Sequence, residues 1–149
     1  MTPSPLTGKW SDRFLNLATH IATWSKDPSS KVGAVIVNGD RQVVGMGYNG
    51  FPRGTSDDPA LYNDRAEKYL RVVHAEVNAV LNATSSTQGA TVFVTHPPCS
   101  QCMALLIQAG VKTVVHPTPD PAMAERFAES FDAARSMAYE ADVMIVEKL

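Results

Sequence analysis

Apolar residues along the chain follow two patterns, a helical spacing and short continuous runs, and the two alternate. From residue 9 to about 25, apolar positions recur every three or four residues, which predicts an amphipathic helix ending before the Asp-Pro pair at 27–28. The apolar run at 32–37 predicts a buried strand. The Asn-Gly-Asp turn at 38–40 and the segment 42–48 predict a second strand, antiparallel to the first.

The second half of the chain continues the alternation. Helices are expected over 65–71, 74–83, 99–109 and 122–141, and strands over 90–95, 111–115 and 142–147. Residues 49–64 are expected to be a long polar loop, which a compact domain usually keeps for a functional reason. Strands that alternate with helices pair in parallel through right-handed crossovers. We therefore predict an α/β fold, a three-layer α/β/α arrangement with a five-stranded mixed sheet and helices on both faces.

A glycine pattern in the second strand matches a dinucleotide-binding fingerprint by its letters alone. Gly45, Gly47 and Gly50 have the required spacing, but the fingerprint needs a helix to follow at once. Here Phe-Pro-Arg-Gly follows instead. We interpret the glycines as positions of turns or of close backbone approach.

Length and composition restrict the classes of protein. A chain of 149 residues favours a single domain over 1–149, with residues 1–8 as a loose N-terminal arm. The net charge of −2 and the absence of a Lys/Arg run argue against polynucleotide or membrane-surface binding. Two cysteines three positions apart, no signal-peptide pattern and no long apolar span favour a soluble protein of a reducing compartment, the cytoplasm.

Three side chains form a candidate zinc site. His74, Cys99 and Cys102 supply one imidazole and two thiols, a ligand set for one zinc ion per chain. Three protein ligands leave the fourth tetrahedral position to water, as in catalytic zinc sites. Glu76 follows the histidine by two residues, where it can transfer protons without binding metal. His-x-Glu followed by Pro-Cys-x-x-Cys is the signature of zinc deaminases, which hydrolyse an exocyclic amine from a nucleobase.

The spacing of these residues predicts how the site is built. Cys99 and Cys102 share a helix face, but residues two apart, such as His74 and Glu76, do not. His74 and Glu76 can both reach one site only if that site lies at the N-terminal end of their helix, next to its first turn. We therefore expect two helix N-termini directed at one metal, where the helix dipole helps keep a thiolate charged.

Two other readings of the cysteine pair remain open. A Cys-x-x-Cys pair also occurs in redox motifs, although no thioredoxin-like pattern surrounds this one. A structural zinc site would need a fourth protein ligand, for which His96 is the candidate. In that case the protein would be a non-catalytic zinc module.

Four sequence blocks resemble the deoxycytidylate deaminase family of the cytidine deaminase-like superfamily, over about residues 9–116. They are Lys-Val-Gly-Ala-Val-Ile-Val at 31–37, Gly-Tyr-Asn-Gly-Phe-Pro at 47–52, His-Ala-Glu-Val-Asn-Ala at 74–79 and Pro-Cys-Ser-Gln-Cys at 98–102. The zinc motif is common to the superfamily, whereas the Gly-Tyr-Asn-Gly-x-Pro block is typical of this family. The resemblance implies zinc-dependent hydrolysis of deoxycytidylate (dCMP) to dUMP and ammonia, which supplies thymidylate synthesis.

The resemblance also implies substrate contacts. It assigns the sugar hydroxyl to Asn49, the base carbonyl to the amide of Ala75 and the phosphate to Lys26, with His96 as a further contact. The alternatives are a turn residue for Asn49 and a solvated helix end for Lys26.

Departures from the family pattern change some expectations. Residues 51–73 contain no Cys or His, so the second, structural zinc of some members is not expected. Val-His-Pro at 115–117 replaces a tyrosine that grips the phosphate in many members. This leaves another cytosine nucleotide or nucleoside, a base-modified dCMP or another nucleobase as alternative substrates. Family members are typically oligomers, often hexamers, so a homo-oligomer is expected.

Overall fold

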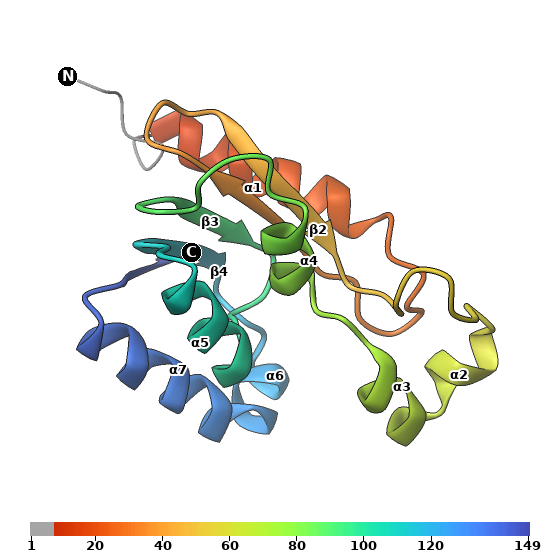
Figure 1. Cartoon of the computed structure of the whole chain (residues 1–149). Helices are drawn as coiled ribbons and strands as arrows, with labels where there is room; N and C mark the ends of the chain where they lie inside the picture. Colours follow the sequence, from red (N-terminus) through yellow and green to blue (C-terminus); the bar gives the residue numbers. More distant parts are fainter. Residues whose placement is uncertain (1–7) are drawn as a thin grey trace.

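A five-stranded mixed sheet forms the centre of the computed structural model, which describes residues 8–149 (Figure 1). The strands are β1 (Gly33–Val37), β2 (Val43–Tyr48), β3 (Thr91–Val94), β4 (Thr113–Pro117) and β5 (Met144–Lys148). Their order across the sheet is β2-β1-β3-β4-β5. Strand β1 runs antiparallel to both β2 and β3, whereas β3, β4 and β5 are parallel. The predicted mixed α/β sheet is confirmed.

The described residues form seven helices in addition to this sheet. They are α1 (Gly8–Ala22), α2 (Pro59–Asn63), α3 (Arg65–Arg71), α4 (Ala75–Leu81), α5 (Ser100–Gln108), α6 (Pro121–Arg126) and α7 (Ala128–Glu140). The arm predicted at residues 1–8 lies outside the described residues except for Gly8, which begins α1. Within residues 8–149, no helix has both the length and the apolar character that a bilayer span requires.

Helices cover both faces of the sheet, as predicted. On one face, Phe14 and Ile21 of α1 pack against Val35 and Phe93 of the central strands. On the other face, α4, α5 and α7 pack against the remaining apolar side chains of the sheet, including Ile36. The central strands are buried on both sides, which explains why they read as continuous apolar runs.

Helices α2 and α3 lie beside the body of the molecule as an arm (residues 59–71, the α2–α3 arm; Figure 1). The prediction of an unbroken loop over 49–64 was wrong, because α2 occupies its last third. Asp58 caps α2 by accepting a hydrogen bond from the amide of Ala60, and Pro59 occupies the first helical position. This is a helix-start signal that the low apolar content of the segment concealed.

The helix predicted over 122–141 is in fact two helices. Helix α6 ends at Arg126 and α7 begins at Ala128, with Phe127 between them at φ −109° and ψ 18°. Neither glycine nor proline marks this break. The spacing of apolar residues alone therefore predicted one continuous helix.

Two glycines of β2 allow α4 to pack directly on the sheet. A Cβ atom on Gly47 would lie 2.4 Å from the amide nitrogen of Ala79 and 2.5 Å from the carbonyl oxygen of Ala75. A Cβ atom on Gly45 would lie 2.5 Å from the Ala79 carbonyl oxygen. The glycine pattern therefore reflects close backbone approach, and no helix follows Gly50 until α2.

Strand β2 is an edge of the sheet, and its backbone carbonyls receive hydrogen bonds from outside the strand ladder. Asn78 donates to the Tyr48 carbonyl at 2.8 Å, and Asn82 donates to the Met46 carbonyl at 3.0 Å. The backbone amide of Thr84, which follows α4, donates to the Val44 carbonyl at 2.9 Å. Side chains and backbone around α4 thus satisfy acceptors that an edge strand would otherwise expose.

Candidate active site

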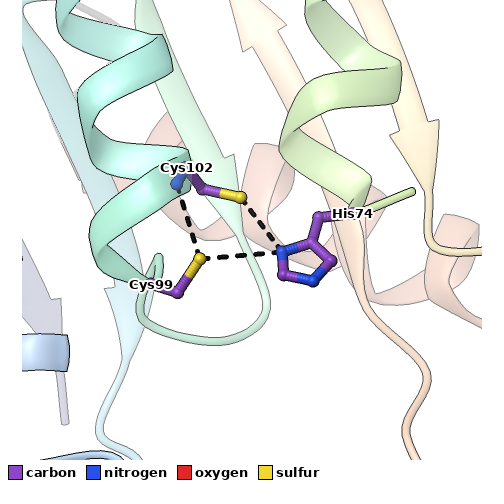
Figure 2. Close-up of side chains that lie close together, drawn as sticks. All are labelled: His74, Cys99 and Cys102. Carbon is purple, nitrogen blue, oxygen red and sulfur yellow. Dashed lines mark hydrogen bonds between the residues drawn. The ribbon is translucent and has the colours of Figure 1, made fainter. Parts of the chain in front are cut away.

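The N-termini of α4 and α5 lie side by side and carry the predicted metal ligands, whose side chains point toward one another (Figure 2). His74 is the N-cap residue of α4 and Cys99 is the N-cap residue of α5, where its sulfur accepts a hydrogen bond from the amide of Cys102. Paired backbone hydrogen bonds between Gly50 and Val73, at 3.1 and 2.7 Å, fix the chain just before His74. The end-on arrangement expected from the sequence is therefore what the structure shows.

The three ligand atoms have the spacing of a zinc site. His74 Nδ1 lies 3.2 Å from Cys102 Sγ and 3.6 Å from Cys99 Sγ, and all three atoms lie within 4.8 Å of one another. Tetrahedral zinc bound to nitrogen and sulfur places these atoms about 3.5 Å apart. One imidazole and two thiols in this spacing fit zinc, and across residues 8–149 no fourth His, Cys, Asp or Glu joins the cluster.

Local hydrogen bonds favour the charged form of one thiol. The side chain of Cys102, the imidazole of His74 and the amide of Cys102 lower the pKa of Cys99 to about 4, although burial opposes the shift. A thiolate is the form that binds a metal. The local structure at the N-terminus of α5 therefore favours the form of Cys99 that could bind a metal.

Glu76 lies beside the cluster without belonging to it. Its side chain is buried, with 5% of the residue exposed, and its carboxyl group contacts the side chain of Cys102. Burial raises the pKa of Glu76 to about 7. A carboxyl group with a pKa near neutrality can both accept and donate a proton.

A cleft of about 640 Å³ reaches this cluster, a volume within the range of ligand sites. His74, Glu76 and Cys99 form one end of its lining. Further residues come from the loops after α1, β2 and β3, from the α2–α3 arm and from α6 with its N-cap; they include Asp27, Asn49, Tyr62, Arg65, Lys68, Tyr69, His96, Asp120 and Arg126.

Three of the four predicted substrate contacts line the cleft: Asn49, Ala75 and His96. Asn49 is buried, accepts a hydrogen bond from the Val32 amide at 2.8 Å and donates one to the Ser30 carbonyl at 2.8 Å. These bonds fix its orientation in the wall of the cleft.

His96 and Lys26, the two predicted contacts with ionisable side chains, differ in where they lie. Burial lowers the pKa of His96, which favours its neutral form at the cleft wall, and His96 is not part of the ligand cluster. Lys26 does not line the cleft. Its side chain is exposed and pairs with Asp57 at 2.7 Å.

Sequence reasoning missed a buried ion pair in the cleft wall. Lys68 of α3 pairs with Asp27 at 2.7 Å, and the Asp27 side chain is inaccessible to solvent. The amides of Ser29 and Ser30 also donate to Asp27. The pair joins the α2–α3 arm to the body, and because its partners are far apart along the chain, no local pattern marks it.

The sequence has clear relatives among known proteins. Residues 8–118 match the family described as the cytidine and deoxycytidylate deaminase zinc-binding region. An uncharacterised deaminase encoded in the luxG 3′ region of Aliivibrio fischeri is 39% identical over 140 residues, 94% of each chain. Human deoxycytidylate deaminase is 44% identical over 113 residues, which cover 72% of this chain and 64% of the human protein. The chain thus spans just under two thirds of that relative's length.

The fold has a similar counterpart among solved structures. The dCMP deaminase of the cyanophage S-TIM5, solved in complex with dCMP and dUMP, superposes with a TM-score of 0.75 at 24% identity, covering 96% of this chain and 99% of the phage protein. The resemblance read from the sequence blocks is confirmed, and zinc is the metal of this family. By sequence match, fold and ligand cluster, the chain belongs to the cytidine and deoxycytidylate deaminase zinc-binding family.

Proposed function

We propose that this protein catalyses the zinc-dependent hydrolysis of dCMP to dUMP and ammonia. The observation that carries the proposal is the buried Glu76 carboxyl beside a His-Cys-Cys cluster at one end of a nucleotide-sized cleft. Relatives named deoxycytidylate deaminase at 44–45% identity support the choice of substrate.

The side chains of the site divide the chemistry between them. His74, Cys99 and Cys102 would hold zinc, which when bound supplies water with a pKa lowered to about 7. Glu76 takes one proton from the attacking water and delivers it to N3 of the cytosine, then takes the proton of the resulting C4 hydroxyl and delivers it to the departing amine. Water adds at C4, the C4–N4 bond breaks and ammonia leaves, which converts cytosine to uracil.

The cleft wall orients the nucleotide in this proposal. The backbone amide of Ala75, at the start of α4, donates to the base carbonyl. Asn49 contacts the sugar hydroxyl from its fixed position in the wall, and neutral His96 is a further contact from the cleft lining. Together these contacts place C4 at the metal end of the cleft.

A substrate panel on purified protein tests the proposal. Ammonia release is measured with dCMP, CMP, deoxycytidine, dCTP, 5-methyl-dCMP, free cytosine and guanine, and zinc is quantified in the same sample. We expect dCMP to give the highest kcat/KM with one zinc per chain. Inert dCMP beside an active alternative would contradict the substrate, and full zinc content with no turnover of any compound would favour a non-catalytic zinc module.

We also propose that the protein works as a homo-oligomer in the cytoplasm. Apolar side chains are exposed around the edge strand, among them Val43, Met46 and Tyr48 of β2 and Trp24 after α1, and a subunit contact would cover them. Both cysteines are free thiols, the state that a reducing compartment maintains. Light scattering coupled to size-exclusion chromatography would reveal the assembly, and a mass of about 16 kDa would contradict it.

A further inference from the structure

Two arginines lie at the exposed part of the cleft that contains Glu76. Arg65 begins α3, Arg126 ends α6, and both residues line the cleft. Both residues are exposed, whereas Glu76 is buried. The lining of the cleft therefore extends from a buried carboxyl group beside the predicted metal ligands to exposed arginine residues on two elements, which we call the mouth of the cleft.

The positive charge of these arginines is available to a ligand. Of the three basic side chains in the lining, Lys68 is neutralised by Asp27. Within residues 8–149 neither Arg65 nor Arg126 forms an ion pair. The remaining acidic group of the lining apart from Glu76 is Asp120, which caps α6 by accepting a hydrogen bond from the Met123 amide at 2.8 Å.

One contact joins the two sides of the mouth. Arg126 Nη2 donates to the hydroxyl of Tyr69 on α3 at 3.1 Å, and its guanidinium lies 5.0 Å from the ring centre of Phe127. These contacts hold the guanidinium in place. Arginine has five N–H donors, so the bond to Tyr69 leaves donors free for an anion.

We propose that Arg65 and Arg126 bind the 5′-phosphate of the nucleotide, and that Lys26 does not. The inference rests on the proposed function, which places the base at the metal end. A nucleoside monophosphate carries its phosphate at the end opposite the reacting base, which corresponds to the exposed mouth. Guanidinium groups bind phosphate through paired hydrogen bonds. Lys26 is paired with Asp57 away from the cleft lining.

Tyr69 is the positioning residue in this arrangement, because it holds Arg126 without needing to touch the phosphate. The variant Y69F keeps the ring and removes only the hydroxyl. We expect it to raise the KM for dCMP by a smaller factor than R126Q, with kcat unchanged and with the activity on deoxycytidine unchanged.

The test compares dCMP with deoxycytidine, which differ only in the phosphate. In R65Q and R126Q we expect kcat/KM for dCMP to fall roughly tenfold or more, through KM, because each loses a charge-assisted contact. The value for deoxycytidine should stay within about twofold of wild type. R71Q is the matched control on α3, since Arg71 pairs with Glu67 and does not line the cleft.

Product inhibition gives an independent reading that needs no change in turnover. R65Q and R126Q should weaken inhibition by dUMP but not by deoxyuridine, and R126K should retain part of the affinity for dUMP. Zinc content and the urea midpoint of each variant report whether the fold is intact.

Each outcome supports or overturns a stated claim. A wild-type preference for dCMP that survives in both R65Q and R126Q overturns the inference and leaves the proposed function standing. Loss of that preference in K26Q, with both arginine variants unaffected, assigns the phosphate to Lys26 instead. A wild-type enzyme that does not distinguish dCMP from deoxycytidine overturns the proposed substrate and this inference together.

Discussion

In the proposed mechanism, two residues of the His-Ala-Glu sequence have separate roles, metal binding for His74 and proton transfer for Glu76. His74 has an extended backbone, with φ −71° and ψ 155°, and therefore presents its ring at the helix end, whereas Glu76 lies inside the first turn of α4. The three candidate metal ligands and the Glu76 carboxyl group could be proposed from the sequence, because they lie in two short motifs. The structure of each motif depends mainly on residues close together in the sequence. The roles of these residues remain proposals that variants can test.

The variant E76Q tests the division of roles at the residue scale. Glutamine preserves the size of the side chain but cannot take up the proton, so we expect kcat to fall by about 10²-fold or more. Zinc content, measured by metal analysis, and the unfolding midpoint should stay near wild type, because Glu76 is outside the ligand cluster. E140Q, at an exposed position ending α7, is the control, and loss of zinc in E76Q would contradict the assignment.

Residues that act through distant partners could not be predicted from the sequence. Lys68 and Asp27 meet only because α3 folds back on the loop after α1, and Arg65 and Arg126 share a cleft although they lie on different elements. By contrast, Lys26 was predicted as a phosphate contact from its position in the sequence alone. Its pairing with Asp57 depends on a loop whose path no local pattern describes.

The Asp27–Lys68 pair makes stability depend on pH. Burial would raise the pKa of Asp27, but hydrogen bonds from Lys68, Ser29 and Ser30 outweigh it, so the pKa lies below its usual value. The stabilisation is therefore complete above the unfolded pKa, about 3.9, and is lost as pH falls through the lower folded pKa.

The variant D27N tests this linkage. At pH 7 we expect it to lower the free energy of unfolding by about 3 kcal/mol, because Lys68 loses its partner. The difference between wild type and D27N should shrink below about pH 4, as seen by urea unfolding at several pH values. A difference that stays constant down to pH 2 would show that the charge of Asp27 contributes nothing.

At the scale of elements, the contact of β2 with α4 sets the position of the site. Because Gly45 and Gly47 have no side chains, α4 packs directly on β2. This contact fixes the position of the α4 N-terminus relative to the sheet. The sequence indicated these glycines as close-approach positions but could not name the partner. It also missed α2 and the break at Phe127, since a short capped turn and a break without Gly or Pro leave little trace in apolar spacing.

The variant G47A tests the close approach. Its Cβ would meet backbone atoms of Ala75 and Ala79, which cannot rotate away, so we expect a loss of about 1–3 kcal/mol in the free energy of unfolding. Because α4 carries His74, zinc affinity should fall as well. G39A is the matched control, since nothing lies within 4 Å of its added Cβ, and equal stability of the two variants would contradict the packing argument.

At the scale of the whole molecule, the metal ligands connect two parts of the sheet. Helix α4 comes after the β1–β2 hairpin and the α2–α3 arm, whereas α5 connects the parallel strands β3 and β4 (Figure 1). The sequence predicted the mixed sheet and helices on both faces, because alternating elements restrict the topology strongly. The strand order depends on the side of the sheet on which each new strand is added. No local sequence pattern indicates that side.

Zinc removal should therefore affect the stability of the whole protein. Since zinc binds the folded site, chelation with EDTA should lower the Tm by several degrees, and added zinc should restore it. Differential scanning calorimetry measures the shift. C102S, which lacks a ligand, should melt at a temperature that EDTA does not change, and an equal shift in this variant would indicate that EDTA acts elsewhere.

The hydrogen bonds that Asn78 and Asn82 donate to β2 have a consequence for behaviour at high concentration. Because the carbonyls of Met46 and Tyr48 are already satisfied, this edge is a poor template for a strand from another molecule. Two copies that meet here would associate through side chains rather than through a continuous intermolecular sheet. The same two asparagines that secure α4 would thus also protect the protein against fibril-like growth.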